Sequence, residues 1–198
     1  MPEKRRFGIP AAWDSIVKID TPAHIKRRFA DSLFAWGRRL SENNLMGPHS
    51  DGLCGSLSYR HALGMVITSP PARMDRLSDH DLRFIEVLKL QQDGGGVLTS
   101  KPPDAIQSCH ALAYQSQGGV IFVFHVIDPR LEKAATKVGL IAIDSDPAAN
   151  PSCFQAEFET QLARCNVIAV RNRGVFSLGC TAEDAGEQIM RLCLKLKT

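Results

Sequence analysis

The sequence predicts an α/β protein of three layers, in which a central, mostly antiparallel sheet carries helices on both faces. Strand-like and helix-like segments interleave along the 198 residues, but no strict β–α–β repeat links them. The run Val120 to Phe124 is continuously apolar and of strand length, which is typical of a central strand covered on both faces. The chain is long enough for one domain with a substantial core.

Composition excludes several classes of protein. A hydrophobic content of 44% with 23% charged residues is ordinary for a globular protein, and a net charge of +3 is too small to indicate nucleic-acid binding. The longest apolar stretch is about five residues, against the ~20 that cross a bilayer. The six cysteines form no CxxC pair, and the basic start of the chain is not followed by an apolar run. We therefore expect a cytoplasmic protein with reduced cysteines.

The first part of the chain divides into an arm and the start of the domain. Residues 1–20 are predicted to be an N-terminal arm packed on the surface, and residues 21–198 a single domain. Thr21 and Pro22 have the residue types of a helix N-cap and first turn, and the predicted helix ends near Asn43 and Asn44. Its apolar stripe consists of Ile25, Phe29, Leu33, Trp36 and Leu40.

The middle of the chain reads as strands. Residues 53–59 and 62–69 are predicted to be two strands joined by a short turn, and Pro70-Pro71 ends the second. Further strands are predicted over 84–90 and 140–143, on either side of a helix that Pro102-Pro103 opens and that ends near Gly118-Gly119.

The last third has the clearest local signals. Ser152 with Gln155 matches a capping box and begins a helix in which Phe154, Phe158 and Leu162 step by four. A strand over 167–170, the turn Arg171-Asn172-Arg173-Gly174 and a second short strand follow. Thr181 with Asp184 caps the last helix, whose predicted inner face is Ala185, Ile189, Leu192 and Leu196.

Five local strings in this order resemble the class II aldolase/adducin head-domain family over roughly residues 23–194. The string at 55–60, GSLSYR, is similar to the family's G-N-I/V-S-x-R, and MVITSP at 65–70 to its strand M-L/V-I-T-P. LSDHDL at 77–82 resembles L-S/T-x-x-D, HALAY at 110–114 resembles H-x-x-I/A-Y, and RNRG at 171–174 resembles R/N-N-H-G. The resemblance implies a class II aldolase-like fold and a homotetramer.

The resemblance also implies a divalent metal, usually zinc, held by three histidines beside a catalytic glutamate, where it stabilises an enediolate as a Lewis acid. Only His125 is retained at these positions. The second histidine falls on Ile127, the third on Arg173, and the glutamate on Ile106. Because isoleucine is no ligand and arginine is a permanent cation, we predict no metal ligand set and no cofactor. Zinc is expected only if the family's histidine ligands align with other residues of this chain.

The phosphate pocket that the resemblance implies is altered in the same way. Ser56 stands where the family has asparagine, Pro70-Pro71 where it has threonine and glycine, and Asp104 and Ala105 where it has two serines. An aspartate at a phosphate site is electrostatically unfavourable. We assign Arg173, Ser56 and Ser58 as candidate ligand-binding residues for a small anion, and His125 and Asp104 as candidate catalytic residues.

Each candidate also has a structural interpretation. His125 ends a buried strand and is a core histidine in one interpretation and a proton-transfer group in the other. Arg173 is either a solvated turn residue or a guanidinium that replaces the metal charge and binds a carboxylate. Asp104 either favours a helix N-terminus or pairs with Arg173. Cys109 and His110 are neighbours on one helix and face different directions, so we assign both to the core rather than to a nucleophile–base pair.

Three functional hypotheses follow. The first is a binding or assembly module that has lost the metal site. The second is a metal-independent lyase, dehydratase or isomerase acting on a carboxylated or keto substrate. The third is a divergent metal-dependent sugar-phosphate aldolase.

Overall fold

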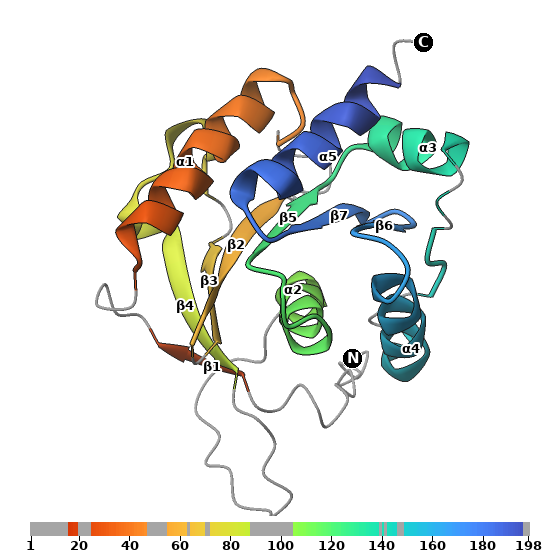
Figure 1. Ribbon diagram of the computed structural model, residues 1–198, viewed down its shortest axis with the longest axis horizontal. Coiled ribbons are helices and arrows are strands. Elements are labelled where there is room, and N and C mark those ends of the chain that lie inside the picture. Colours follow the sequence, from red (N-terminus) through yellow and green to blue (C-terminus); the bar gives the residue numbers. More distant parts are fainter. Residues whose placement is uncertain are drawn as a thin grey trace, which may run out of the picture.

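A computed structural model of the protein describes residues 16–19, 25–46, 55–62, 64–69, 72–87, 105–138, 140, 142–145 and 149–195. Within these ranges the strands form one sheet in the order β1-β4-β3-β2-β5-β7-β6, and each neighbouring pair is antiparallel. Figure 1 shows α1, α3 and α5 on one face of the sheet and α2 and α4 on the other. The predicted three-layer α/β fold with a mostly antiparallel sheet is therefore confirmed.

The predicted elements occur in the predicted order along the chain, together with some that were not predicted. The strands are β1 Ile16–Ile19, β2 Ser56–His61, β3 Gly64–Thr68, β4 Leu82–Val87, β5 Phe122–Val126, β6 Val167–Val170 and β7 Gly174–Gly179. The helices are α1 Arg27–Glu42, α2 Ala105–Ser116, α3 Pro129–Lys137, α4 Pro151–Leu162 and α5 Ala182–Leu194, with short turns η3 Met74–Arg76 and η4 Asp79–Asp81.

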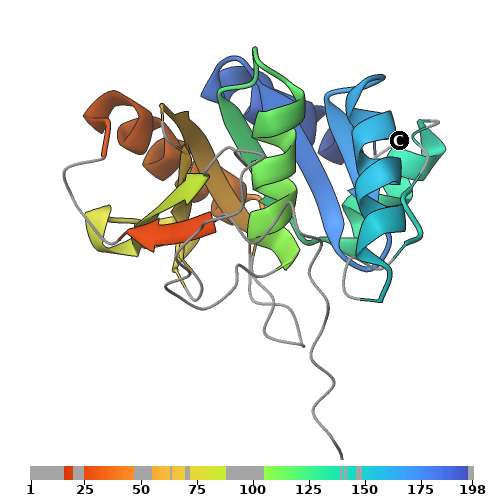
Figure 2. The same ribbon diagram turned by 90° about the horizontal axis from the view of Figure 1, so that it is seen from below.

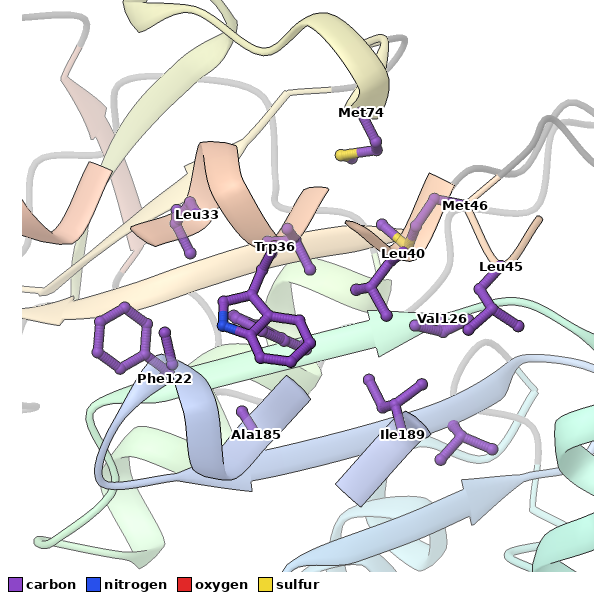
Figure 3. Packing of buried hydrophobic residues seen from close by; sticks show 14 of the residues in the cluster. Leu33, Trp36, Leu40, Leu45, Met46, Met74, Phe122, Val126, Ala185 and Ile189 are labelled. Carbon is purple, nitrogen blue, oxygen red and sulfur yellow. The ribbon is translucent and has the colours of Figure 1, made fainter. Parts of the chain in front are cut away.

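One face of the sheet packs against α1 and α5 through aromatic and aliphatic side chains. Trp36 of α1 lies between the helices and the sheet, with its ring 6.1 Å from that of Phe124 on β5. Figure 3 shows how this cluster joins side chains of α1 and α5 to the sheet. Its members include Leu33, Leu40, Phe122, Val126, Ala185 and Ile189. Burial of this apolar area is the main driving force for the layer.

The opposite face packs against α2 and α4, which lie side by side in Figure 2. Phe154, Phe158 and Leu162, the predicted stripe of α4, are all buried there. Successive residues of a strand point to opposite faces, so Phe122, Phe124 and Val126 belong to the first cluster and Val123 to this one. The same alternation places His125 on the α2 face.

Several element boundaries differ from the predictions for local reasons. Helix α1 begins at Arg27, and the predicted cap Thr21 lies outside the described residues. Helix α4 begins earlier than the Ser152 signal, because Asn150 accepts the bond from the Cys153 amide and Pro151 takes the first helical position. In the predicted strand 140–143, the described residues 140, 142 and 143 form only a parallel bridge, between Ile143 and Val170.

One helix and one strand were not anticipated. Asp128 caps α3 by accepting from the Arg130 amide at 2.7 Å, with Pro129 in the first turn, so the helix has an ordinary N-terminal signal that the sequence prediction did not use. In addition, Ile16–Ile19 of the predicted arm pairs with β4 as the edge strand β1.

Candidate functional site

The site begins with a row of side chains that crosses three neighbouring strands on the α2 face. Ser56 of β2 is paired with His125 of β5, and His125 is paired with Phe176 of β7. Directly paired residues of an antiparallel sheet project from the same face. The His125 imidazole accordingly stacks on the Phe176 ring at 4.3 Å between centroids and 19° between planes.

Helix α2 adds a second imidazole to this row. Nε2 of His110 lies 2.9 Å from the Ser56 hydroxyl, and Nδ1 lies 2.7 Å from the Ser58 hydroxyl. The Ser58 hydroxyl also lies 2.7 Å from the Tyr114 hydroxyl and 3.4 Å from the carbonyl oxygen of Val123. His110 and Tyr114 stand four residues apart and so share one face of α2. We call Ser56, Ser58, His110 and Tyr114 the α2 polar cluster.

One arrangement of protons satisfies the whole α2 polar cluster with a neutral imidazole. Tyr114 O–H and His110 Nδ1–H donate to Ser58, Ser58 donates to the Val123 carbonyl, and Ser56 donates to His110 Nε2. Burial lowers the pKa of His110 well below its ordinary value of 6.5, and nearby His125 lowers it further. Burial raises the pKa of the Tyr114 hydroxyl. The cluster is therefore uncharged.

His125 is held from its other side by the turn between β6 and β7. Its Nε2 lies 2.6 Å from the main-chain carbonyl oxygen of Arg173. A carbonyl only accepts, so in the neutral ring Nε2 carries the proton and Nδ1 is an acceptor. Among the described residues Nδ1 has no hydrogen-bond partner. Burial lowers the pKa of His125 to about 4. The hydrogen bond to the carbonyl opposes this shift, and the positive charge of Arg173 adds to it.

The turn that presents this carbonyl has a constrained main chain. Asn172 has φ of 57° and Gly174 has φ of 93°, both in the left-handed region. A Cβ on Gly174 would overlap the carbonyl oxygen of Val126 and lie 2.9 Å from Cα of Ile127. Residues outside the turn hold it in place. The Arg171 side chain pairs with Asp144, and the Glu132 carboxylate of α3 accepts a hydrogen bond from the Asn172 amide at 3.2 Å.

Arg60 holds the C-terminal end of α2 in place. Its guanidinium donates to the carbonyl oxygens of Tyr114, of Gln117 at 2.6 Å and of Val120 at 2.7 Å. It also lies over the Tyr114 ring, 5.2 Å from the centroid. The last carbonyls of a helix lack partners within the helix, and a cation there complements the helix dipole. Arg60 thus holds the helix that carries His110.

The structure brings most of the predicted site residues together. Ser56, Ser58 and His125 lie on one sheet face, and Arg173 follows directly in the adjoining turn, while Asp104 and its predicted pairing with Arg173 lie outside the described residues. Sequence reasoning placed His110 in the core and did not recognise it as the centre of the cluster. The available signal was the i, i+4 spacing of His110 and Tyr114.

The side chains at the three histidine positions implied by the resemblance do not fit a divalent metal. His125 offers its Nε2 proton to a carbonyl, Ile127 is apolar and buried, and Arg173 carries a permanent positive charge. His110 has both ring nitrogens bonded to serines. Within the described part of the chain, no three His, Cys, Asp or Glu residues are grouped as a metal site.

Comparison with known proteins establishes the fold. No family model and no curated protein matches the sequence. The structure resembles L-fuculose-1-phosphate aldolase from Thermus thermophilus, with a TM-score of 0.64, 15% identity and coverage of 87% of this chain and 92% of that one. It also resembles an aldolase II superfamily protein from Pseudomonas syringae, with TM-score 0.62, 14% identity and coverage of 88% and 76%.

A third similar structure is the sugar-phosphate aldolase from Thermotoga maritima, with TM-score 0.59, 12% identity and coverage of 86% of this chain and 93% of that one. The chain therefore has the class II aldolase-like fold that its five sequence strings predicted.

Proposed function

We propose that this chain is a class II aldolase-like protein that has lost the zinc site and sugar-phosphate aldolase activity and acts as a binding or assembly module. The observation that carries the proposal is the donor set at the end of β5. One imidazole, one buried isoleucine and one arginine stand at the positions where the resemblance calls for three imidazoles. Three neutral nitrogen ligands stabilise Zn²⁺, whereas a fixed guanidinium repels it.

Metal analysis of the purified protein tests this proposal. We expect no stoichiometric zinc after incubation with zinc and desalting. We also expect no rise in melting temperature with zinc, or with phosphorylated sugars in the presence of zinc. Stoichiometric zinc that is lost on His125→Phe would support the third hypothesis, a divergent metal-dependent aldolase, and would overturn the proposal. Phenylalanine preserves stacking on Phe176 while removing both ring nitrogens.

A metal-independent lyase, dehydratase or isomerase is the second candidate, and the position of Arg173 favours it. The charge of Arg173 lies close enough to His125 to lower its pKa, so a cation stands beside a neutral imidazole. Such a pair suits a carboxylated or keto substrate, with the guanidinium holding the anion and the imidazole moving a proton. His125 would be a weak base, because its pKa of about 4 is well below neutral pH.

Keto acids distinguish the two candidates. A rise in melting temperature with pyruvate or 2-oxoglutarate that Arg173→Ala removes and Arg171→Ala preserves would favour the enzyme. Arg171 is a matched control because it belongs to the same turn and pairs with Asp144 at the surface. No response to either acid, in the unmodified chain or in the variants, is the result that the binding module predicts.

The assembly part of the proposal is a homo-oligomer, a tetramer by resemblance, in the cytoplasm. None of the described helices is both long and apolar enough to cross a membrane. Light scattering coupled to size-exclusion chromatography measures the mass directly: we expect four times the chain mass of 21.7 kDa. A single-chain mass at micromolar concentration would remove the assembly role.

A further inference from the structure

A main-chain carbonyl of the β6–β7 turn is hydrogen-bonded to Nε2 of His125. The contact is a hydrogen bond of 2.6 Å between Nε2 and the Arg173 carbonyl oxygen. We propose that this carbonyl holds His125 in the Nε2–H form and keeps the end of β5 closed to zinc even when histidines are restored at positions 127 and 173. The inference rests on the proposed loss of the metal site and adds that the main chain, besides the side chains, maintains the loss.

The first step of the argument is the chemistry of the ring. An imidazole binds a metal through an unprotonated nitrogen. The Arg173 carbonyl has no proton to give, so a hydrogen bond at this nitrogen requires that Nε2 be protonated. A zinc ion at Nε2 would have to displace both the proton and the carbonyl. Nδ1 keeps its lone pair, but it is buried within the protein.

The second step is that the carbonyl is not free to turn away. The Arg173 amide donates to the Val170 carbonyl at 3.0 Å, and Glu132 accepts from the Asn172 amide. Gly174 follows with φ of 93°, and the main chain of Val126 and Ile127 leaves no room for a Cβ beside it. Rotation of the peptide between residues 173 and 174 would change this φ at a position without free space. The turn thus presents the carbonyl to His125 whatever side chain stands at 173.

The third step concerns position 127. Ile127 is only 9% exposed and directly follows the last residue of β5. Histidine at 127 therefore supplies an imidazole close to His125 along the chain, and histidine at 173 supplies one from the turn. Restoring both side chains brings the number of imidazoles to three, but it leaves Nε2 of His125 protonated.

Zinc binding by the double variant Ile127→His/Arg173→His is the test. We expect isothermal titration with zinc sulfate to show no one-to-one site that depends on His125. The triple variant with His125→Phe should bind any residual zinc with the same affinity, within about twofold. A one-to-one site that weakens about tenfold or more on His125→Phe would overturn the inference. It would leave the proposed function standing, because the unmodified chain is tested separately and would overturn that proposal only if it bound zinc itself.

The ring nitrogens of the unmodified chain give a second readout that does not depend on how the variant folds. Long-range proton–nitrogen correlation spectra of histidine-labelled protein distinguish a protonated from an unprotonated ring nitrogen. At pH 7 we expect His125 to have a protonated Nε2 and an unprotonated Nδ1, with a slowly exchanging Nε2 proton, and to keep this pattern after zinc addition. The reverse tautomer would overturn the inference.

Discussion

The Ser58 hydroxyl on β2 lies 2.7 Å from Nδ1 of His110 on α2, and both side chains are completely buried. This contact joins a helix to a strand 52 residues earlier in the chain, through polar groups in a layer that is mainly apolar. Buried polar groups are costly unless they are paired, so the contact favours one position of α2 along β2.

Ser58→Ala should destabilise the protein more than Ser56→Ala. Removal of Ser58 takes away the oxygen to which Nδ1–H of His110 and the Tyr114 O–H donate, whereas Ser56 bonds only to His110 within the cluster. We expect a loss of about 2–3 kcal/mol for Ser58→Ala and about 1 kcal/mol for Ser56→Ala in the free energy of unfolding. Urea denaturation with unchanged m-values measures both. Equal losses would mean that Ser58 is not the centre of the network.

Stability should fall as the pH drops from 6.5 towards 4. The pKa of His125 is about 4 in the folded protein and near 6.5 when the chain is unfolded, so between these values the unfolded state binds the extra proton. His110 shifts in the same direction. Stability is therefore fully present above pH 6.5, and the His125 shift alone removes roughly 3 kcal/mol once the pH reaches about 4.

Urea midpoints between about pH 7.5 and 5 measure this slope. His125→Phe should flatten it, and His80→Gln should preserve it, because His80 is exposed in η4. An unchanged slope in His125→Phe would show that His125 does not carry the effect.

Arg60→Lys should loosen the end of α2. Lysine cannot reproduce the planar set of donors that bonds three carbonyl oxygens, so we expect a loss of about 2 kcal/mol. Arg38→Lys on the exposed face of α1 is the control, with an expected change within about 0.5 kcal/mol. Hydrogen exchange should quicken at the amides of residues 113–117 in the Arg60 variant alone, and uniform protection in both would contradict the role of Arg60.

Gly174→Ala should be severely destabilising while Gly118→Ala is nearly neutral. Alanine at 174 is strained at φ of 93° and overlaps the main chain of β5, so we expect a loss of about 3 kcal/mol or more. A Cβ on Gly118 meets nothing within 4 Å, and the change there should stay within about 0.5 kcal/mol. Thermal denaturation compares the two, and similar melting temperatures would show that the turn adapts.

Local signals in the sequence predicted much of the fold. Thr181 and Asp184 form the predicted capping box of α5, and Ala185, Ile189 and Leu192 of its predicted inner face are buried. The strand, turn and strand over 167–179 are present as predicted. These features depend on residues within one or two turns of each other, and their chemistry can be read without knowing what packs against them. The Asp128-Pro129 start of α3 was of the same kind and was overlooked.

The site depended on contacts between distant parts of the chain. His125 and Arg173 were both predicted as site residues, but the bond between them uses a main-chain carbonyl 48 residues away, which no side-chain pattern reveals. His110 lies in the core as predicted, but its bonds to Ser56 and Ser58 were not predicted, because these serines lie on another element.

The sequence by itself determined most of the elements and their order, because periodicity, capping and turn chemistry are local. The class II aldolase-like fold was implied by the resemblance of its five strings to that family, and the same resemblance identified the residue types at the end of β5. Only the tertiary structure decided which nitrogen of each imidazole is bonded and to what. Those bonds require strand register and helix docking, which bring β2, α2, β5 and the β6–β7 turn together across the sheet.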